Sequence, residues 1–258
     1  MSQPTKEPSL RDKELLRDKE PPRNKEVRGD ERRTQRRQEI VETAARLFAD
    51  WGYAGCEMER VASELGIAKG TLYLYFPGKQ ELFFACVDWA MTQLQVAVRA
   101  AANEGGDDPF AQISRAVRAY LVFFHEHPQF VELLIKERAI FRDRKRPTYY
   151  EHRDANRGYW RELYGELIRT GRLRGDLNVE VLLDTIGNLL YGTMFTNHFL
   201  GPSTTIDEQH RAMLDVIFRG ILSDKEREGK TPKKPELRIP NDEASTNAAL
   251  AAFFLRLW

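Results

Sequence analysis

The sequence predicts an all-α protein with a small three-helix head near the N-terminus and a larger helical body after it. Three observations indicate this class. From residue 36 to residue 222 apolar residues recur at helical spacing, glycine or proline interrupts most of these patterns, and no alternating strand pattern of useful length is present. A chain of 258 residues, 41% hydrophobic and 31% charged, is also long enough to bury a sizeable core.

Polar regions flank the helical part. Residues 1–35 are rich in charge and poor in apolar side chains, and their arginines repeat every six residues, which fits neither helix nor strand, so we expect a disordered arm. Residues 223–241 are polar and contain proline, which is typical of a linker. Residues 242–258 end in NAALAAFFLRLW, and we expect an amphipathic helix that docks on the body or on a second subunit rather than a frayed end.

Several functional classes are not expected. Cys56 and Cys86 are too few for a disulfide framework, and no apolar run resembles a signal peptide or approaches the roughly 20 residues of a membrane span. We therefore expect a cytoplasmic protein without a membrane partner. No catalytic motif or nucleotide-binding loop is present, so we expect no catalytic residue and no cofactor. His125 and His127 flank Glu126 at a spacing that does not converge on one helix face, so no metal site is expected.

The functional signal lies in LGIAKGTLYLYFPGKQEL, residues 65–82. Gly66 ends one short helical pattern and allows a sharp turn, and Ile67 supplies the apolar contact that keeps the next short helix packed. That helix begins near Ala68, and we expect Leu72 and Phe76 to face inward. With the longer helix before it, this arrangement predicts a helix-turn-helix head over residues 36–82. The inward stripe expected on the first helix is Ile40, Ala44, Leu47, Phe48 and Trp51.

Residues 36 to about 93 resemble the DNA-binding head of TetR/AcrR-type transcriptional regulators. The matching pieces are IVETAARLFADWGY, MERVASELGIAKGTLYLYF and GKQELFFACV, whereas the rest of the chain resembles the family only in helical layout. The resemblance implies a homodimer that binds a palindromic operator in double-stranded DNA and is released by a small-molecule effector, with repression as the expected outcome. By position it assigns DNA contacts to Lys69, Gly70, Thr71, Tyr73, Tyr75 and Lys79, although Tyr75 could instead pack against the head.

The chemistry of these residues suits DNA. Gly70 keeps the helix surface low, and the helix N-terminus and the Thr71 hydroxyl favour phosphate oxygens. Lys79 can add a charge-assisted contact. Such contacts fix the position of a protein on DNA more than they read its sequence.

Two features depart from the family pattern. Where the family has a hydroxyl at the start of each short helix, this chain has Cys56–Glu57 and Ala68, and each lost cap typically costs about 1 kcal/mol. From residue 38 to residue 79 there are also more acidic than basic side chains. These features leave an alternative open, a ligand-binding or scaffolding dimer with a degenerate head. Cys56 could be an oxidant-sensitive thiol of lowered pKa or a small buried residue.

Four arginines precede the acidic head, and we predict that they supply the charge that it lacks. Deleting residues 1–35 should then weaken operator binding and flatten its dependence on salt. An unchanged salt slope would contradict this role. These arginines are Arg32, Arg33, Arg36 and Arg37.

The body, residues 83–222, is expected to hold a dimer interface and a pocket for an apolar effector. The resemblance places the interface on the last two strong helices, although about half of the residues below could equally be internal core. The interface residues expected are Ile186, Leu189, Leu190, Thr193, Met213, Val216 and Ile217. The pocket residues expected are Phe124, Tyr159, Tyr164, Tyr191 and Phe195.

Overall fold

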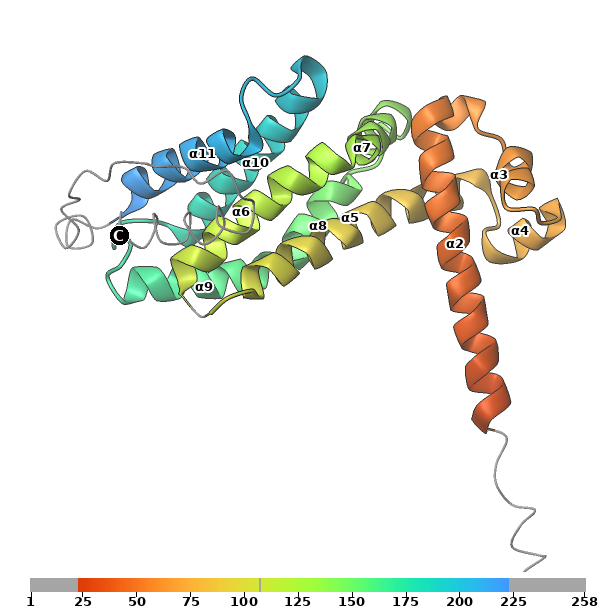
Figure 1. Ribbon diagram of the computed structural model, residues 1–258, viewed down its shortest axis with the longest axis horizontal. Coiled ribbons are helices and arrows are strands. Elements are labelled where there is room, and N and C mark those ends of the chain that lie inside the picture. Colours follow the sequence, from red (N-terminus) through yellow and green to blue (C-terminus); the bar gives the residue numbers. More distant parts are fainter. Residues whose placement is uncertain (1–22, 107, 223–258) are drawn as a thin grey trace, which may run out of the picture.

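The computed structural model describes residues 23–106 and 108–222 (Figure 1). The all-α class is confirmed: in this part of the chain the only strand-like pairing is an isolated antiparallel bridge between Leu173 and Leu222. The helices are α2 (Arg23–Gly55), α3 (Met58–Glu64), α4 (Lys69–Tyr75), α5 (Lys79–Asn103), α6 (Pro109–Glu126), α7 (Pro128–Ile140), α8 (Thr148–Ala155), α9 (Arg157–Arg169), α10 (Val179–Leu200) and α11 (Ile206–Ile221).

The helices form a small head and a longer body (Figure 1). Helices α2, α3 and α4 make the head at one end, and α6 to α11 make the body. Helix α5 belongs to both, because it begins beside α2 and continues along α6. The N-terminal part of α2 projects away from both units.

The start of α2 corrects the expected arm. Residues 23–35 were assigned to a disordered segment, but they are helical and continue into the packed part of α2 that begins at Ile40. Residues 31–38 explain the difference, since all but Thr34 are Glu, Arg or Gln, which are strong helix formers. A helix already nucleated by packing is extended easily by such residues. Residues 1–22, the expected linker 223–241 and the expected C-terminal helix 242–258 lie outside the described residues.

Residues 148–169 form two helices, α8 and α9, rather than one long helix. The break lies at Asn156, whose side-chain amide donates to the carbonyl oxygen of His152 at 3.0 Å. Asparagine competes for backbone groups in this way, which disfavours it inside helices.

The core runs through both units, with one correction in the head. Trp51 was expected on the inward stripe of α2, but 55% of its surface is exposed and the guanidinium of Arg60 lies 4.0 Å from its ring centroid. Trp51 lies one residue before the break at Gly52 (φ 71°), where the inward stripe of α2 ends. The head residues that are buried include Ile40, Ala44, Phe48, Val61, Leu72, Phe76 and Leu82.

One buried carboxylate ties the loop after α7 to α8. Glu137 is 2% exposed. Its oxygens accept hydrogen bonds from Arg144 Nη1 at 2.7 Å, from the Thr148 hydroxyl at 2.7 Å and from the Thr148 amide at 3.0 Å. The same guanidinium lies 4.6 Å from the ring centroid of Phe84 on α5. Glu137 and Arg144 together therefore link α7, α8 and α5.

Candidate nucleic-acid interface and body cavity

The turn between α3 and α4 has the hydrogen bonds that the glycine at position 66 permits. The Gly66 amide donates to the Ser63 carbonyl at 3.1 Å, and the Ile67 amide donates to the Ala62 carbonyl at 3.0 Å. These two bonds form a Schellman motif, which requires the positive φ of 63° found at Gly66. Ile67 then packs, half-buried, against the core. The local sequence thus sets the angle at which α4 leaves α3.

Helix α4 has one buried and one exposed side. Leu72 is fully buried, and Phe76, just after the helix, is 2% exposed. On the other side lie Lys69, Gly70, Tyr73 and Leu74, spaced so that they share one helix face. Thr71 and Tyr75 lie between the two sides and are half-buried. Leu74, which the sequence analysis did not single out, is 76% exposed and adds an apolar group to this outward face.

Neither a backbone conformation nor a close contact within the protein requires glycine at position 70. Gly70 is inside α4, its φ is not positive, and a Cβ added there would meet no atom within 4 Å. Glycine nevertheless costs roughly 1 kcal/mol relative to alanine in a helix. The flat surface at this position would allow something outside the chain to approach α4 closely.

The missing hydroxyl caps are confirmed. Neither Glu57, before α3, nor Ala68, before α4, makes a side-chain capping bond. The Glu57 carboxylate instead accepts from Lys79 Nζ at 2.9 Å. The first turn of α4 consequently has no side-chain acceptor of its own.

Both lysines expected at the interface are engaged inside the head. The Lys69 ammonium donates to Glu59, and this bond lowers the pKa of the Glu59 carboxyl and raises the pKa of Lys69. Lys79 also donates to the Ala54 carbonyl at 3.3 Å, and its side chain is only 19% exposed. Lys79 therefore links α5 to the end of α2, a structural role that the sequence analysis did not foresee.

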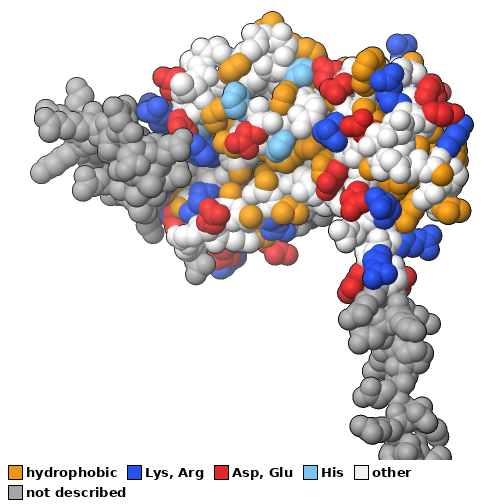
Figure 2. All heavy atoms as spheres, turned by 45° about the vertical axis from the view of Figure 1, so that its right-hand side comes forward, with side chains coloured by type: hydrophobic (Ala, Val, Ile, Leu, Met, Phe, Trp, Pro, Cys, Tyr) orange, Lys and Arg blue, Asp and Glu red, His pale blue; other side chains and the backbone are white. Residues whose placement is uncertain are grey.

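The basic run on α2 lies beside α4. The guanidinium of Arg37 is 4.8 Å from the ring centroid of Phe76, and Arg36 pairs with Glu39 at 2.7 Å. Arg32 and Arg33 are exposed and make no ion pair with another described residue. Figure 2 shows basic side chains where α2 leaves the head, while acidic and basic groups alternate over the head itself. The positive side chains near α4 that form no ion pair with a described residue thus include Arg32 and Arg33 of α2.

Replacing both Arg32 and Arg33 by alanine should flatten the salt dependence of DNA binding without shortening α2. If each contacts one phosphate, the slope of log affinity against log salt should fall by about 1.8. Fluorescence anisotropy over a salt series measures this slope. The control replaces Arg161 and Arg169, two exposed arginines on α9, and should leave the slope as it is. Equal slopes for both double variants would exclude the arm from the interface.

The environment of Cys56 decides between its two interpretations. The side chain is fully buried and burial raises the pKa of its thiol to about 11, despite the nearby Lys79 charge that acts in the opposite direction. A thiol of raised pKa is a poor nucleophile. Cys56 is a small buried residue of the head core.

Comparison with known proteins identifies the head. Residues 40–86 match the sequence family described as bacterial regulatory proteins, tetR family. The head thus matches the tetR family. The matched range contains α3, α4 and the Schellman turn between them.

Two tetR-family relatives match to different extents. The HTH-type transcriptional repressor KstR2 of Mycobacterium tuberculosis is 27% identical over 194 residues, which cover 73% of this chain and 94% of KstR2. YerO of Bacillus subtilis, an HTH-type transcriptional regulator, is 28% identical over 117 residues, 45% of this chain and 40% of YerO. The chain thus matches less than half the length of YerO.

Solved structures share the fold. The structure of KstR2 has a TM-score of 0.51 at 22% identity and covers 73% of this chain and 96% of that one. The fatty acid degradation regulator FadR from Bacillus halodurans has a TM-score of 0.60 at 16% identity and covers 71% of this chain and 98% of FadR. The matches therefore extend the tetR-family fold from the head into the body.

The body contains a cavity among α5, α6, α8, α9 and α10. Its volume is about 960 Å³, including the space at its open mouth. Its lining is mostly apolar, and polar side chains from α5, α8 and α9 lie at part of its wall. The residues that line it include Met91, Leu94, Val98, Ile113, Val117, Tyr120, Tyr149, Trp160, Tyr164, Ile186 and Leu190.

Only one of the five expected pocket residues lines this cavity, namely Tyr164. Phe124 lines a smaller pocket between α6 and α10. Tyr159 is covered by Arg99, whose guanidinium lies 3.7 Å from its ring centroid. Tyr191 and Phe195 pack edge to face, with ring centroids 4.7 Å apart, and line neither space. Helical periodicity predicts which side of a helix is apolar, but not whether that side meets a cavity or another helix.

Some of the residues expected at the dimer interface are buried inside the protomer, and others are exposed on its surface. Ile186, Met213 and Ile217 are at most 8% exposed in the protomer, so they are internal core, as the alternative interpretation allowed. Leu189 and Val216 are exposed, whereas Leu190 and Thr193 are half-buried. An exposed stripe does run along α10 at helical spacing, and we call it the α10 stripe. It consists of Val181, Thr185, Asn188, Leu189, Gly192, Thr196, Phe199 and Leu200.

Across residues 23–106 and 108–222, no three His, Cys, Asp or Glu side chains are grouped to hold a metal ion. His125 is exposed, while His127 stacks on Phe130 with centroids 5.2 Å apart. Within the same ranges, every helix is too short or too polar to cross a bilayer.

Proposed function

We propose that this chain is a ligand-responsive transcriptional repressor that binds a palindromic DNA operator as a homodimer. The observation that carries the proposal is the outward face of α4, which is held by a Schellman turn and has a flat centre at Gly70 that nothing within the protein requires. A short helix of this kind fits the major groove, where side chains can reach base edges. The repressor KstR2 supports the sign of regulation.

Dimerisation is supported by the surface of α10. Phe199 and Leu200 are 63% and 83% exposed, and with Val181 they leave a long apolar stripe uncovered in the protomer. Small residues such as Gly192 along the stripe allow a partner helix to approach closely. Val216 on α11 is 69% exposed and would extend the contact. A second copy of the chain would bury these side chains and present two recognition helices to one duplex.

The effector is proposed to be a small, mainly apolar molecule in the body cavity. Met91 and Leu94 line the cavity from α5, and the same helix begins in the head at Lys79. A ligand that shifts α5 would therefore change the position of α4. The neighbours described as ketosteroid and fatty acid degradation regulators support an apolar effector.

Operator binding tests the proposal. We expect the chain to bind tightly and in a salt-sensitive manner to a palindrome in the region upstream of its own gene, or in duplexes selected from a random library. A duplex with one half-site should bind at least about 100-fold more weakly, because only one head is engaged. Gel shift and anisotropy measure both values. Weak binding that ignores sequence would instead favour a scaffolding dimer with a degenerate head.

Dimerisation through the proposed surface is tested by Val216→Arg. The variant should be monomeric at micromolar concentration and lose its preference for the full palindrome, because an unpaired arginine would be buried at the contact. The matched control is Val96→Arg on α5, which is 59% exposed and distant from α10 and α11 in sequence. Light scattering after gel filtration should report a dimer for the control. A dimeric Val216→Arg variant would exclude α11 from the contact.

A further inference from the structure

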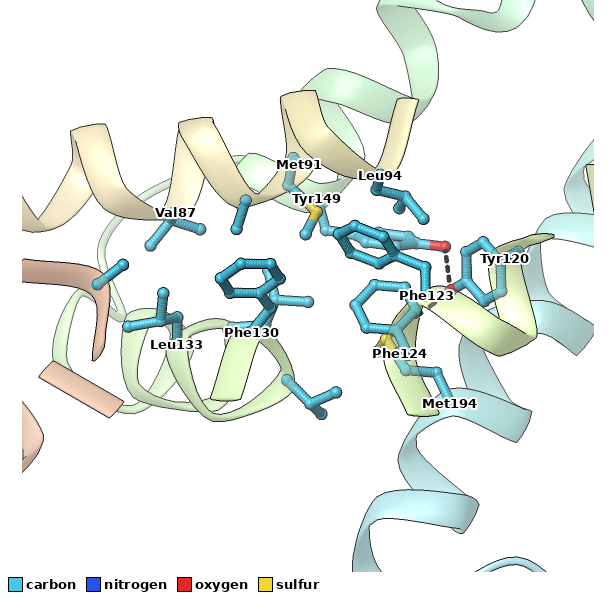
Figure 3. Packing of buried hydrophobic residues seen from close by; sticks show 14 of the residues in the cluster. Val87, Met91, Leu94, Tyr120, Phe123, Phe124, Phe130, Leu133, Tyr149 and Met194 are labelled. Carbon is cyan, nitrogen blue, oxygen red and sulfur yellow. Dashed lines mark hydrogen bonds between the residues drawn. The ribbon is translucent and has the colours of Figure 1, made fainter. Parts of the chain in front are cut away.

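Three tyrosines from three helices line the body cavity, and they differ in their hydrogen bonds. The hydroxyls of Tyr120 on α6 and Tyr149 on α8 are 3.0 Å apart and bond to each other, as Figure 3 shows. Tyr120 also lies 3.8 Å from the sulfur of Met194, a weak acceptor. These two hydroxyls therefore satisfy each other within the protein.

Tyr164 on α9 has no such partner. The residue is only 3% exposed and lines the cavity, and no hydrogen bond joins its hydroxyl to a described residue. Burial alone raises the pKa of this phenol, which therefore keeps its proton. A hydroxyl at a cavity wall that makes no bond within the protein is free to donate to a bound molecule, and a few such polar groups in an apolar pocket fix the orientation of a ligand.

The charged groups at the cavity wall are already neutralised. Arg157 donates to Glu180 and to Asp184, at 2.6 Å in each case. His152 Nε2 lies 2.7 Å from an Asp88 oxygen, and its Nδ1 accepts from the Gln95 amide at 2.7 Å. A ligand carboxylate would find its potential partners occupied and would lose its own hydration.

Arg153 completes this set. Its guanidinium contacts Asp154 at 3.3 Å and Asp184 at 3.6 Å, and it lies 4.9 Å from the ring centroid of Tyr150. Every charged side chain that lines the cavity therefore has a charged partner of opposite sign. The two arginines at the wall share the Asp184 carboxylate and are thus paired within the protein.

We infer that the cavity binds an uncharged, mainly apolar molecule that carries an oxygen acceptor, and that the Tyr164 hydroxyl donates a hydrogen bond to this oxygen. A ketone, ester or ether in a ring or chain framework has the required chemistry, whereas a free carboxylic acid does not. The inference rests on the proposed ligand-responsive function, because it names the class of effector for that site.

Three naphthalenes substituted at the same ring position test the inference, since they have similar shapes. Acetylnaphthalene has a neutral acceptor, isopropenylnaphthalene is its apolar counterpart, and naphthoate is its anionic counterpart. Calorimetric titration of the full chain should rank them in this order of affinity. We expect acetylnaphthalene to bind about fivefold more tightly than isopropenylnaphthalene, the value of one hydrogen bond, and naphthoate to bind at least about tenfold more weakly.

The variant Tyr164→Phe should remove the preference for the acetyl group and leave the affinity for isopropenylnaphthalene within about twofold of its original value. The control is Tyr159→Phe on the same helix, because the Tyr159 hydroxyl donates to Gln112 at 3.2 Å and does not line the cavity. It should leave all three affinities unchanged.

The outcomes separate this inference from the proposed function. Tightest binding of naphthoate, an unchanged acetyl preference in Tyr164→Phe, or no binding of any of the three would overturn the inference. Operator binding, measured on the same preparation, does not depend on these results. If the ranking is found but none of the ligands changes operator binding, the ligand class stands and the ligand-responsive part of the proposed function fails.

Discussion

Replacing Gly70 by glutamine is expected to leave the head folded and to weaken operator binding by about 100-fold or more, which is roughly 2.7 kcal/mol. The helix should become more stable by up to about 1 kcal/mol, since glutamine is a better helix former than glycine and no atom lies within 4 Å of the added Cβ. The side chain would stand in the middle of the outward face of α4, where it would hold the helix away from the bases. Stability and binding should therefore change in opposite directions.

Thermal unfolding and anisotropy on the selected operator measure the two effects. Gly165→Gln provides the control, because Gly165 is inside α9 and likewise has open space at its Cβ position. That variant should keep full operator affinity. Gly70→Ala should give a smaller loss than Gly70→Gln, since its side chain is shorter. If Gly70→Gln bound the operator like the unmodified chain, α4 would not be the helix that enters the groove.

Replacing Glu137 by alanine should lower the free energy of unfolding by about 3–5 kcal/mol. The change would leave the Arg144 guanidinium with one carboxylate partner, Glu151, and would leave the Thr148 amide and hydroxyl without their acceptor. An unpaired buried donor costs more than the hydrogen bond contributes when it is made. The Glu137 carboxylate therefore contributes to stability mainly because its loss would leave the donors of Thr148 without an acceptor and would take one carboxylate partner from Arg144.

Urea denaturation of the full chain tests this prediction through the midpoint and the slope. Glu137→Gln is the control, since its amide oxygen can still accept from Thr148 while the charge is lost, and it should cost less than the alanine variant. Glu151→Gln, at an exposed partner of the same arginine, should cost at most about 1 kcal/mol. A loss below about 1 kcal/mol for Glu137→Ala would mean that α7 and α8 are joined by apolar packing alone.

The head could be predicted from the sequence because its decisive features are local. The order Leu65-Gly66-Ile67 determines the turn through backbone geometry that only a few residues control, and Leu72 and Phe76 follow from helical spacing. The pairing of Lys79 with Glu57 could not be predicted in the same way. These two residues are distant in sequence, and only the return of α5 to the end of α2 brings them together.

The body was less predictable because each of its helices has apolar residues on more than one side. Ile186 and Leu190 were assigned to a dimer surface, yet both line the cavity. Tyr164 was identified, whereas Tyr120 and Tyr149 were not, since no sequence pattern distinguishes a tyrosine beside a void from one in a packed core. The missing information is the tilt and rotation of neighbouring helices.

The continuity of α5 has a mechanical consequence. A helix rises about 1.5 Å per residue, so the stretch from Lys79 to Met91 is a stiff arm of about 18 Å between the head and the cavity wall. If the wall pivots by about 5°, the far end of this arm moves by about 1.6 Å, and in a symmetric pair the two ends separate by up to about twice that distance. Successive turns of B-DNA are about 34 Å apart, and this spacing does not adjust to the protein without bending or twisting of the duplex. An angular change too small to disturb the fold would thus be enough to put the two heads out of step with the helical repeat.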